Sequence, residues 1–415
     1  MSDYSKVWAL MAGVTLLQLA GGVLGVIAPL GLQAMGVNAI AIGLIAGVHA
    51  AGFMAGAAIA PVAISSVGNI RVFAAAAASM AAGALLMDLA KDPLAWTLVR
   101  ALQGAGFAWM FASVESWLSA ATPPHRRGAV TSAYHVAAKA ALMTGPFFVA
   151  GLSPLAHTPY VWCAFFAALC LIPVCMTRLE EPPRPATRPI SIAALIRLTP
   201  AAVFAVFLAG VINTGLLALL PVFAERVFAA DGAQGGTEAA AFAFAAAWTG
   251  GLLSQWPAGR LSDRIDRRLV VAALAILAGT AALILGLVAH HAPLEVVLAL
   301  VAVWGAGSLS FYGIGVAHAV DRADPADIPS VMSGLLFVWA AGSVIGPLIF
   351  GAAIRWVGPQ GLFLLAAALS AALTAGMLLR RNERAPAKAD DREAWSIAQP
   401  TSVEAGEIDP RSDAV

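Results

Sequence analysis

Long apolar runs are the feature that most restricts what this chain can fold into. A helix needs about 20 apolar residues to cross the hydrocarbon core of a bilayer. Turn and charge clusters separate twelve segments of this kind: 7–30, 38–64, 72–90, 94–119, 129–151, 159–177, 198–224, 240–257, 269–289, 294–320, 329–353 and 361–379. Lipid admits only helices or closed barrels, and the alternating ten-residue pattern of a barrel strand does not occur. We therefore predict an all-α polytopic membrane protein.

Charge is scarce, which excludes most other classes of protein. Charged residues make up 11% of the chain, against about 25% in a soluble globular protein. The formal net charge of +1 leaves no basic surface for a nucleic acid, so we expect none as a partner. Cys163, Cys170 and Cys175 all lie in the sixth predicted span, where they form neither a disulfide framework nor a metal site. We expect no metal and no cofactor.

The distribution of Lys and Arg predicts the topology. If the N-terminus is inside, only Lys91, Arg226 and Arg355 fall in outer loops, and only Arg100 and Lys139 fall within helices. Every other Lys and Arg of the 24 in the chain is then on the inner side, as the positive-inside rule requires. The first apolar run is longer than the core of a signal peptide, so we interpret it as a retained helix. We expect a multi-pass protein of the cell inner membrane with both termini in the cytoplasm.

An internal repeat divides the chain into halves. QGAG at Gln103–Gly106 recurs as WGAG at Trp304–Gly307, and the Gly-Pro pair at Gly145 recurs at Gly346, both displaced by 201 residues. Repeated halves of this kind place a substrate site at their interface, near the membrane midplane.

The domain organisation follows from the repeat and from composition. The proline-rich segment 178–197 separates six spans from six, so we predict a six-helix bundle over 1–177, a cytoplasmic linker over 178–197 and a second bundle over 198–381. From residue 382 the chain is acidic and poor in apolar residues. We therefore expect residues 382–415 to form a disordered cytoplasmic tail.

Three motifs resemble those of the major facilitator superfamily. They are GRLSDRIDRR at Gly259–Arg268, RALQGAGFA at Arg100–Ala108, and GPFFVAG at Gly145–Gly151. The segment Val114–Tyr134 is similar to an uncharacterised bacterial branch of the YcaD type. The resemblance implies the superfamily fold, with twelve transmembrane helices in two pseudo-symmetric six-helix bundles. It also implies secondary transport, and GPFFVAG, at the end of the fifth predicted span, resembles a Gly-Pro motif that is common in antiporter branches.

The resemblance also implies a gating latch at the inner face. Its residues are Gly259, Asp263, Arg264 and Arg267. Contacts of such a charged cluster can break and re-form as the halves rock. The alternative is that these charges only orient the loop. The counterpart in the first half, SSVGNIR at Ser65–Arg71, lacks the acidic residue, so we expect a latch in the second half alone.

Charged and polar residues within helices are the candidates for substrate binding or coupling. Arg100 and Lys139 lie deep in their helices, where a charge is costly and usually faces a cavity. The alternatives are a packing contact of Arg100 with Gln103 and a buried carboxylate partner for Lys139. Glu115 is either a proton carrier or, our preferred interpretation, a structural partner of loop arginines. His135 lies one helical turn from Lys139, and a structural role is the more common one for it and for His49.

The second half offers amphipathic candidates for the other cavity wall. They are Asn213, Thr214, Trp248, Gln255, Trp304, Tyr312 and Trp339. Tryptophan is also common at membrane interfaces, which is the alternative for the three indoles.

We predict a secondary transporter that moves a small anionic or amphipathic solute by alternating access, driven by a proton gradient in the direction of efflux. Proton-coupled uptake of a carboxylate is the alternative, and a non-transporting membrane sensor is a remote one. No phosphate loop, zinc helix motif or nucleophile elbow occurs, so we do not expect an enzyme. We expect a monomer in contact with membrane lipid.

Overall fold

The computed structural model describes residues 4–123, 126–177, 191–228, 235–383, 395 and 398–403. Every regular element within these ranges is helical. In the first half of the chain the elements are α1 (Tyr4–Ala34), α2 (Ala39–Val67), α3 (Asn69–Leu89), α4 (Pro93–Ala121), α5 (Arg127–Thr144), η2 (Gly145–Phe148), α6 (His157–Leu169) and α7 (Leu171–Cys175).

The second half has the same architecture. Its elements are α8 (Ile192–Leu198), α9 (Pro200–Ala209), η3 (Gly210–Thr214), α10 (Gly215–Phe228), α11 (Gly235–Arg264), α12 (Arg267–Val288), α13 (Leu294–Ser308), α14 (Phe311–Val320), η5 (Pro325–Asp327), α15 (Ile328–Val357) and α16 (Gly361–Glu383). Helical segments lie at each of the predicted spans, and nine helices within the described residues are long and apolar enough to cross a membrane. The prediction of an all-α membrane protein is confirmed.

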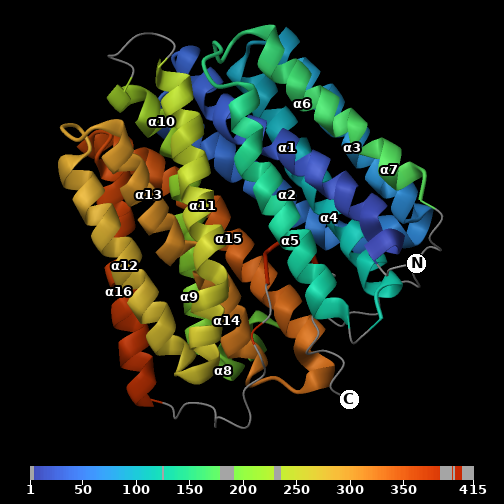
Figure 1. The fold of residues 1–415 in the computed structure, drawn as a ribbon, viewed down its shortest axis with the longest axis vertical. Helices are drawn as coiled ribbons and strands as arrows, with labels where there is room; N and C mark the ends of the chain where they lie inside the picture. The colour runs from blue at the N-terminus through green and yellow to red at the C-terminus, as the bar shows by residue number, and fades with distance from the viewer. Residues whose placement is uncertain are drawn as a thin grey trace.

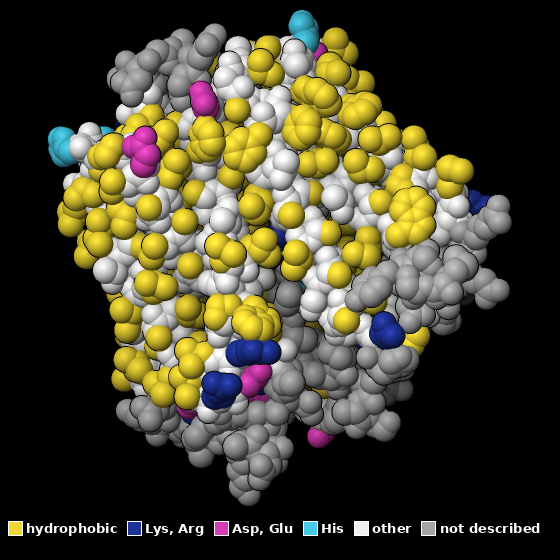
Figure 2. Space-filling view, viewed as in Figure 1, with side chains coloured by type: hydrophobic (Ala, Val, Ile, Leu, Met, Phe, Trp, Pro, Cys, Tyr) yellow, Lys and Arg dark blue, Asp and Glu magenta, His cyan; other side chains and the backbone are white. Residues whose placement is uncertain are grey.

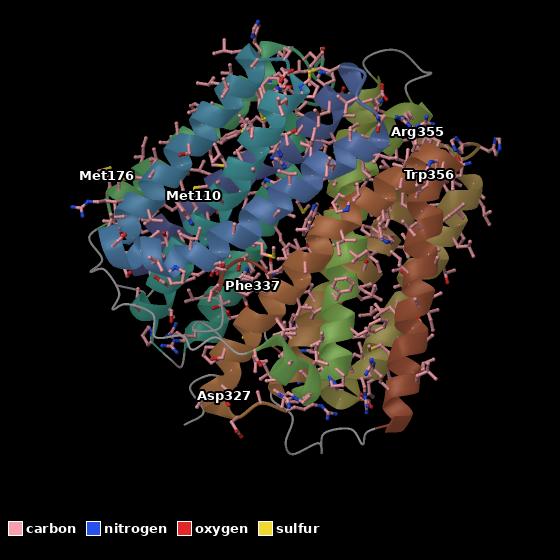
Figure 3. All side chains as sticks on the ribbon, turned by 180° about the vertical axis from the view of Figure 1, so that it is seen from behind. Met110, Met176, Asp327, Phe337, Arg355 and Trp356 are labelled. Carbon is pink, nitrogen blue, oxygen red and sulfur yellow. The ribbon has the colours of Figure 1, made fainter. Side chains whose placement is uncertain are left out.

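The helices form two bundles, with α1–α7 in one and α9–α16 in the other (Figure 1). In Figure 3, α15 rises from Asp327 at one end of the molecule, past Phe337, to Arg355 and Trp356 at the other end. We call the end at which α1 begins and α16 ends the basic face, and the other end the opposite face. Between the two ends, the described surface in view carries many hydrophobic side chains and few charged ones, as expected for a surface in lipid (Figure 2).

Close helix contacts recur in the two halves in equivalent places. A Cβ on Gly104 of α4 would lie 2.1 Å from the His49 carbonyl oxygen of α2. A Cβ on Gly305 of α13, the counterpart of Gly104 in the repeat, would lie 2.0 Å from the Ala247 carbonyl oxygen of α11. Only glycine permits backbones to approach this closely. The repeated glycines therefore make the same helix–helix contact in each pseudo-symmetric half.

The two halves meet at the opposite face. A Cβ on Gly43 of α2 would lie 2.1 Å from the Pro347 carbonyl oxygen of α15. The rings of Phe147 and Phe242 are 5.3 Å apart across the same boundary, and Gln33 donates a hydrogen bond to Glu225. These contacts close the space between the bundles at this face.

Replacing Gly43 with valine is expected to destabilise the protein by about 1–3 kcal/mol, the usual cost of overpacking a tight contact. The added side chain would meet the backbone of α15 rather than a flexible side chain, so the two helices must separate. Thermal unfolding in detergent measures the effect. Leu44→Val is the matched control, because Leu44 is the next residue and is 52% exposed on the lipid side. Equal stability of the two variants would contradict the contact.

Two predicted boundaries differ from the structure. Residues 192–197, assigned to the linker, belong to the short helix α8, whose first turn Ser191 caps by accepting a hydrogen bond from the Ala194 amide. Residues 178–190 lie outside the described residues.

The prediction of a disordered tail over 382–415 is wrong for several of its residues. α16 continues to Glu383, and Ala398, Thr401, Ser402 and Val403 are buried against the helical bundles. Composition and periodicity report only local tendencies. These residues are ordered by contacts with distant parts of the chain, which a polar stretch without periodicity does not reveal. The rest of the expected tail, apart from Trp395, Gln399 and Pro400, lies outside the described residues.

Candidate functional site

A cavity of about 370 Å³ lies between the two bundles. Its wall comes from α1, α2, α4 and α5 of the first half and from η3, α10, α11, α14 and α15 of the second. The polar and charged residues of this wall are Gln18, His49, Arg100, Lys139, Asn213, Thr214, Trp248, Gln255, Tyr312, Trp339, Gln399 and Thr401. A site at the interface of the halves is where the repeat predicts one.

Two cations from the first half face the cavity. A guanidinium nitrogen of Arg100 donates to Gln103 Oε1 over 3.2 Å, and Lys139 Nζ lies 5.9 Å from the centroid of the Trp248 ring. Within the described residues no carboxylate forms a salt bridge with either cation, and the cavity wall contains no Asp or Glu. A buried cation without a counter-charge is costly, so the cavity has an unmet preference for an anion.

His49 contacts the helix that carries Arg100. Its Nδ1 donates to the Arg100 carbonyl oxygen over 3.0 Å, and its ring packs edge-on against Phe107 at 6.1 Å. The close α2–α4 contact at Gly104 brings the two helices near enough for this hydrogen bond. His49 therefore links α2 to α4 beside the cavity, whose wall it also lines.

A widened, π-helical turn supplies polar groups from the second half. The turn is η3, and it interrupts the span between α9 and α10. Asn213 Nδ2 donates to the Ser308 carbonyl oxygen over 3.1 Å, and Thr214 Oγ1 donates to Ser343 Oγ over 2.9 Å. Such turns often occur at functional sites, since they turn side chains out of the regular helical register.

Aromatic rings form much of the remaining wall. They include Phe53, Phe107, Phe111, Phe244, Trp248, Tyr312 and Trp339. Trp339 contacts Phe53 at 6.2 Å and Tyr312 at 6.4 Å between ring centroids, so rings of both halves meet there. Combined with the two cations, this wall suits a solute that has a flat apolar body and a negative group.

Four predicted site residues lie outside the cavity wall. Gln103 contacts the site only through Arg100, and His135 is buried beside Tyr134. Trp304 is fully buried in the core of the second half. Glu115 is fully buried in α4, where Tyr134 donates to its Oε1 over 2.9 Å and Ser402 donates to its Oε2.

The predicted latch residues form a charged cluster at the basic face. Arg267 donates to both carboxylate oxygens of Asp321 at 2.7 and 2.9 Å, and to Asp263 Oδ1 at 3.3 Å. The Arg267 side chain is 1% exposed, whereas Arg264 is exposed. Gly259 and Asp263 contact Trp395 of the C-terminal segment. Asp263 therefore contacts both Arg267 within the second half and a residue beyond α16.

The neighbouring Asp266 shows how the loop before α12 is fixed. Its carboxylate accepts hydrogen bonds from the Arg268 amide and guanidinium at 2.8–3.1 Å. Burial raises the pKa of Asp266, but the hydrogen bonds and charge of Arg268 outweigh burial and hold the pKa below its ordinary value. Asp266, which stands where the superfamily motif usually has glycine, therefore caps α12.

Several cavity residues were not singled out from the sequence. Gln18 and the four phenylalanines lie in helices that carry apolar residues on every side, so nothing in their pattern separates cavity from core. Gln399 and Thr401 were assigned to a disordered tail. The sequence does show a shortage of carboxylates in the helices. Only this shortage could have indicated that the cavity is positively charged.

Comparison with known proteins agrees with this architecture. The family model of the Major Facilitator Superfamily matches residues 10–256 and 202–406. The uncharacterized MFS-type transporter YcaD of Salmonella enteritidis PT4 is 26% identical over 375 residues, which cover 89% of this chain and 94% of the relative. YcaD of Salmonella arizonae is 25% identical over 373 residues, with the same coverage of both chains.

Solved structures with the same fold include two transporters. The nucleoside transporter NupG has a TM-score of 0.75 at 14% identity, covering 91% of this chain and 99% of NupG. A bacterial homologue of the human lysosomal transporter Spinster, in an inward-facing and occupied conformation, has a TM-score of 0.73 at 17% identity, covering 94% and 98%.

Two helical bundles around a largely apolar cavity with two basic residues on its wall are typical of a membrane carrier rather than an enzyme. The chain belongs to the Major Facilitator Superfamily, and its sequence is similar to the YcaD transporters.

Proposed function

We propose that the protein is a secondary carrier for small organic anions with an aromatic or otherwise flat apolar part. The observation that supports this most is the pair of cations, Arg100 and Lys139, on a cavity wall without a described carboxylate. An anion would neutralise them at a depth where water is scarce, so its charge adds to affinity rather than opposing it. The aromatic wall would bind the rest of the solute.

Orientation and coupling complete the proposal. The basic face lies on the cytoplasmic side of a bacterial inner membrane. The positive-inside rule assigns the basic residues of this face to that side, among them Arg71, Arg127, Arg264 and Arg322. The solute leaves the cell in exchange for protons, and the proton gradient supplies the driving force. This direction is supported by the Gly-Pro segment at Gly145–Gly151, which resembles that of antiporter branches. All the residues described on the cavity wall belong to a single chain, and we propose the monomer as the transporting unit.

A binding screen with matched pairs tests the choice of solute. Indole-3-acetate and benzoate are compared with their neutral amides by thermal unfolding of the purified protein in detergent. We expect the anions to raise the unfolding temperature more than the amides do, because only the anions meet the two cations. A ligand at 100 times its Kd stabilises by about 2.7 kcal/mol, which is readily measured.

The screen also has outcomes that oppose the proposal. Equal stabilisation by anions and amides would mean that charge does not govern binding. Stabilisation by aromatic amines alone would mean that the cavity prefers cations, the opposite of the charge preference proposed here.

A further inference from the structure

A short stretch beyond α16 lies between the two bundles at the basic face. It consists of Trp395 and Ala398–Val403, which we call the tail segment (Figure 1). Ala398, Gln399, Pro400 and Thr401 form part of the cavity wall. The cavity is therefore bounded on one side by a piece of chain that belongs to neither helical bundle.

The first end of the tail segment is fixed to the second half. The backbone amide of Trp395 donates to Asp263 Oδ1 over 2.9 Å. The indole ring lies against Gly259, where a Cβ would be 2.2 Å from a ring carbon. Any side chain at position 259 would displace the indole. Two residues of the predicted latch, Gly259 and Asp263, are thus used to hold the tail segment.

The other end contacts the first half, and its last residue also packs against α15 of the second half. Ser402 is 3% exposed and donates a hydrogen bond to Glu115 Oε2, a fully buried carboxylate. Val403 packs in a small apolar cluster with Ala57 of α2, Ala108 of α4 and Leu336 of α15. This end of the segment is therefore anchored both by a buried hydrogen bond and by apolar packing.

The contacts at the two faces differ in kind. At the opposite face the bundles touch each other directly, through Gly43 with Pro347 and Phe147 with Phe242. At the basic face the tail segment contacts Gly259 and Asp263 on one side and Glu115 on the other. The tail segment thus bridges the two bundles at the basic face. It would have to detach from them before a solute could pass or before the bundles could close there.

We propose that the tail segment is a plug, which closes the entrance of the central cavity at the basic face when the bundles are parted there. Its contacts with Asp263 in the second half and with Glu115 in the first must break before that face can close, so its release is a condition for transport. The plug regulates the carrier of the proposed function, but its position and its effect on access can be measured without any solute.

Cross-linking tests the position of the tail segment in the full chain. The three native cysteines are replaced by serine, and Val403→Cys is combined with Leu336→Cys. A short bifunctional thiol reagent is expected to join this pair in membranes. The control pair, Val403→Cys with Val357→Cys, places the second thiol at the far end of α15 and should not be joined. Equal joining of the two pairs, or none in the first, would overturn the placement.

Thiol accessibility tests the effect on access. Ala218→Cys places a single thiol on the cavity wall. A polar maleimide applied to the purified protein should label it about tenfold faster after removal of residues 395–415, the effect of losing one strong anchor. Ser402→Ala and Gly259→Val should accelerate labelling in the same direction, each from one side of the contact.

Matched controls separate release of the plug from general loosening. Removal of residues 404–415 alone keeps the tail segment, and Ser66→Ala alters an exposed hydroxyl at the same face that donates to the Ala63 carbonyl oxygen of its own helix. Both should label at the parental rate. Unchanged labelling after removal of 395–415 would overturn the plug, and so would equal acceleration by the control variants. Failure of the binding screen would leave both of these results unaffected.

Discussion

Replacing Lys139 with alanine is expected to weaken binding of an aromatic anion by roughly tenfold to a hundredfold, the value of one interaction with a charged group. Lys139 is 3% exposed, faces the cavity and has no described carboxylate partner, so its charge is available to a solute. The loss should appear as a higher Kd for indole-3-acetate by titration calorimetry or thermal shift.

Three comparisons make the Lys139 result specific. Lys139→Arg keeps the charge and should recover part of the affinity. Val136→Ala lies on the same helix but is exposed on the lipid side, so it should bind like the parent. Binding of the neutral amide should change little in every variant. If Lys139→Ala bound the anion as tightly as the parent, the cationic wall would not be the anion site.

Replacing Arg267 with alanine is expected to destabilise the folded protein by about 3–5 kcal/mol, which is typical when one partner of a buried ion pair is removed. Asp321, whose side chain is 3% exposed, would lose the two hydrogen bonds from Arg267. The end of α14 would then lose its tie to the start of α12. Thermal unfolding in detergent measures the loss.

Arg264 provides the matched control for Arg267. Both arginines belong to the GRLSDRIDRR segment, but Arg264 is exposed. Arg264→Ala should therefore change stability by well under 1 kcal/mol, as surface substitutions usually do. Arg267→Lys should fall between the two, since lysine cannot reproduce the paired hydrogen bonds of a guanidinium. Similar unfolding of Arg264→Ala and Arg267→Ala would contradict this account.

The fold could be predicted from the sequence because the membrane simplifies the problem. Backbone groups in lipid must be satisfied within helices or barrels, so apolar runs indicate the spans directly. The pseudo-symmetry was also visible, because Gly104 and Gly305 are required at equivalent close contacts. Breaks inside the spans, such as the π-helical turn at Asn213, gave no signal, since they depend on packing against α13 and α15.

The candidate site was only partly predictable. Arg100 and Lys139 stood out, because a charge within an apolar helix usually faces a cavity. The same argument pointed to Glu115, which instead accepts hydrogen bonds from Tyr134 and from Ser402 beyond α16. No local pattern could indicate this last contact, because it joins residues 287 positions apart through the gap between two bundles.

Flux in proteoliposomes tests the central claim, that the protein is a proton-coupled exporter of organic anions, most directly. The full chain is reconstituted into liposomes with an acidic lumen, and entry of a labelled aromatic sulfonate is followed, because a sulfonate stays charged and does not leak across lipid as a neutral acid. If the protein exchanges the sulfonate for protons, the sulfonate accumulates in the acidic lumen, whichever way the protein is inserted. This accumulation should be lost when a protonophore is added or when Lys139 is replaced by alanine. Accumulation in the alkaline compartment instead, or equal entry into protein-free liposomes, would contradict the account.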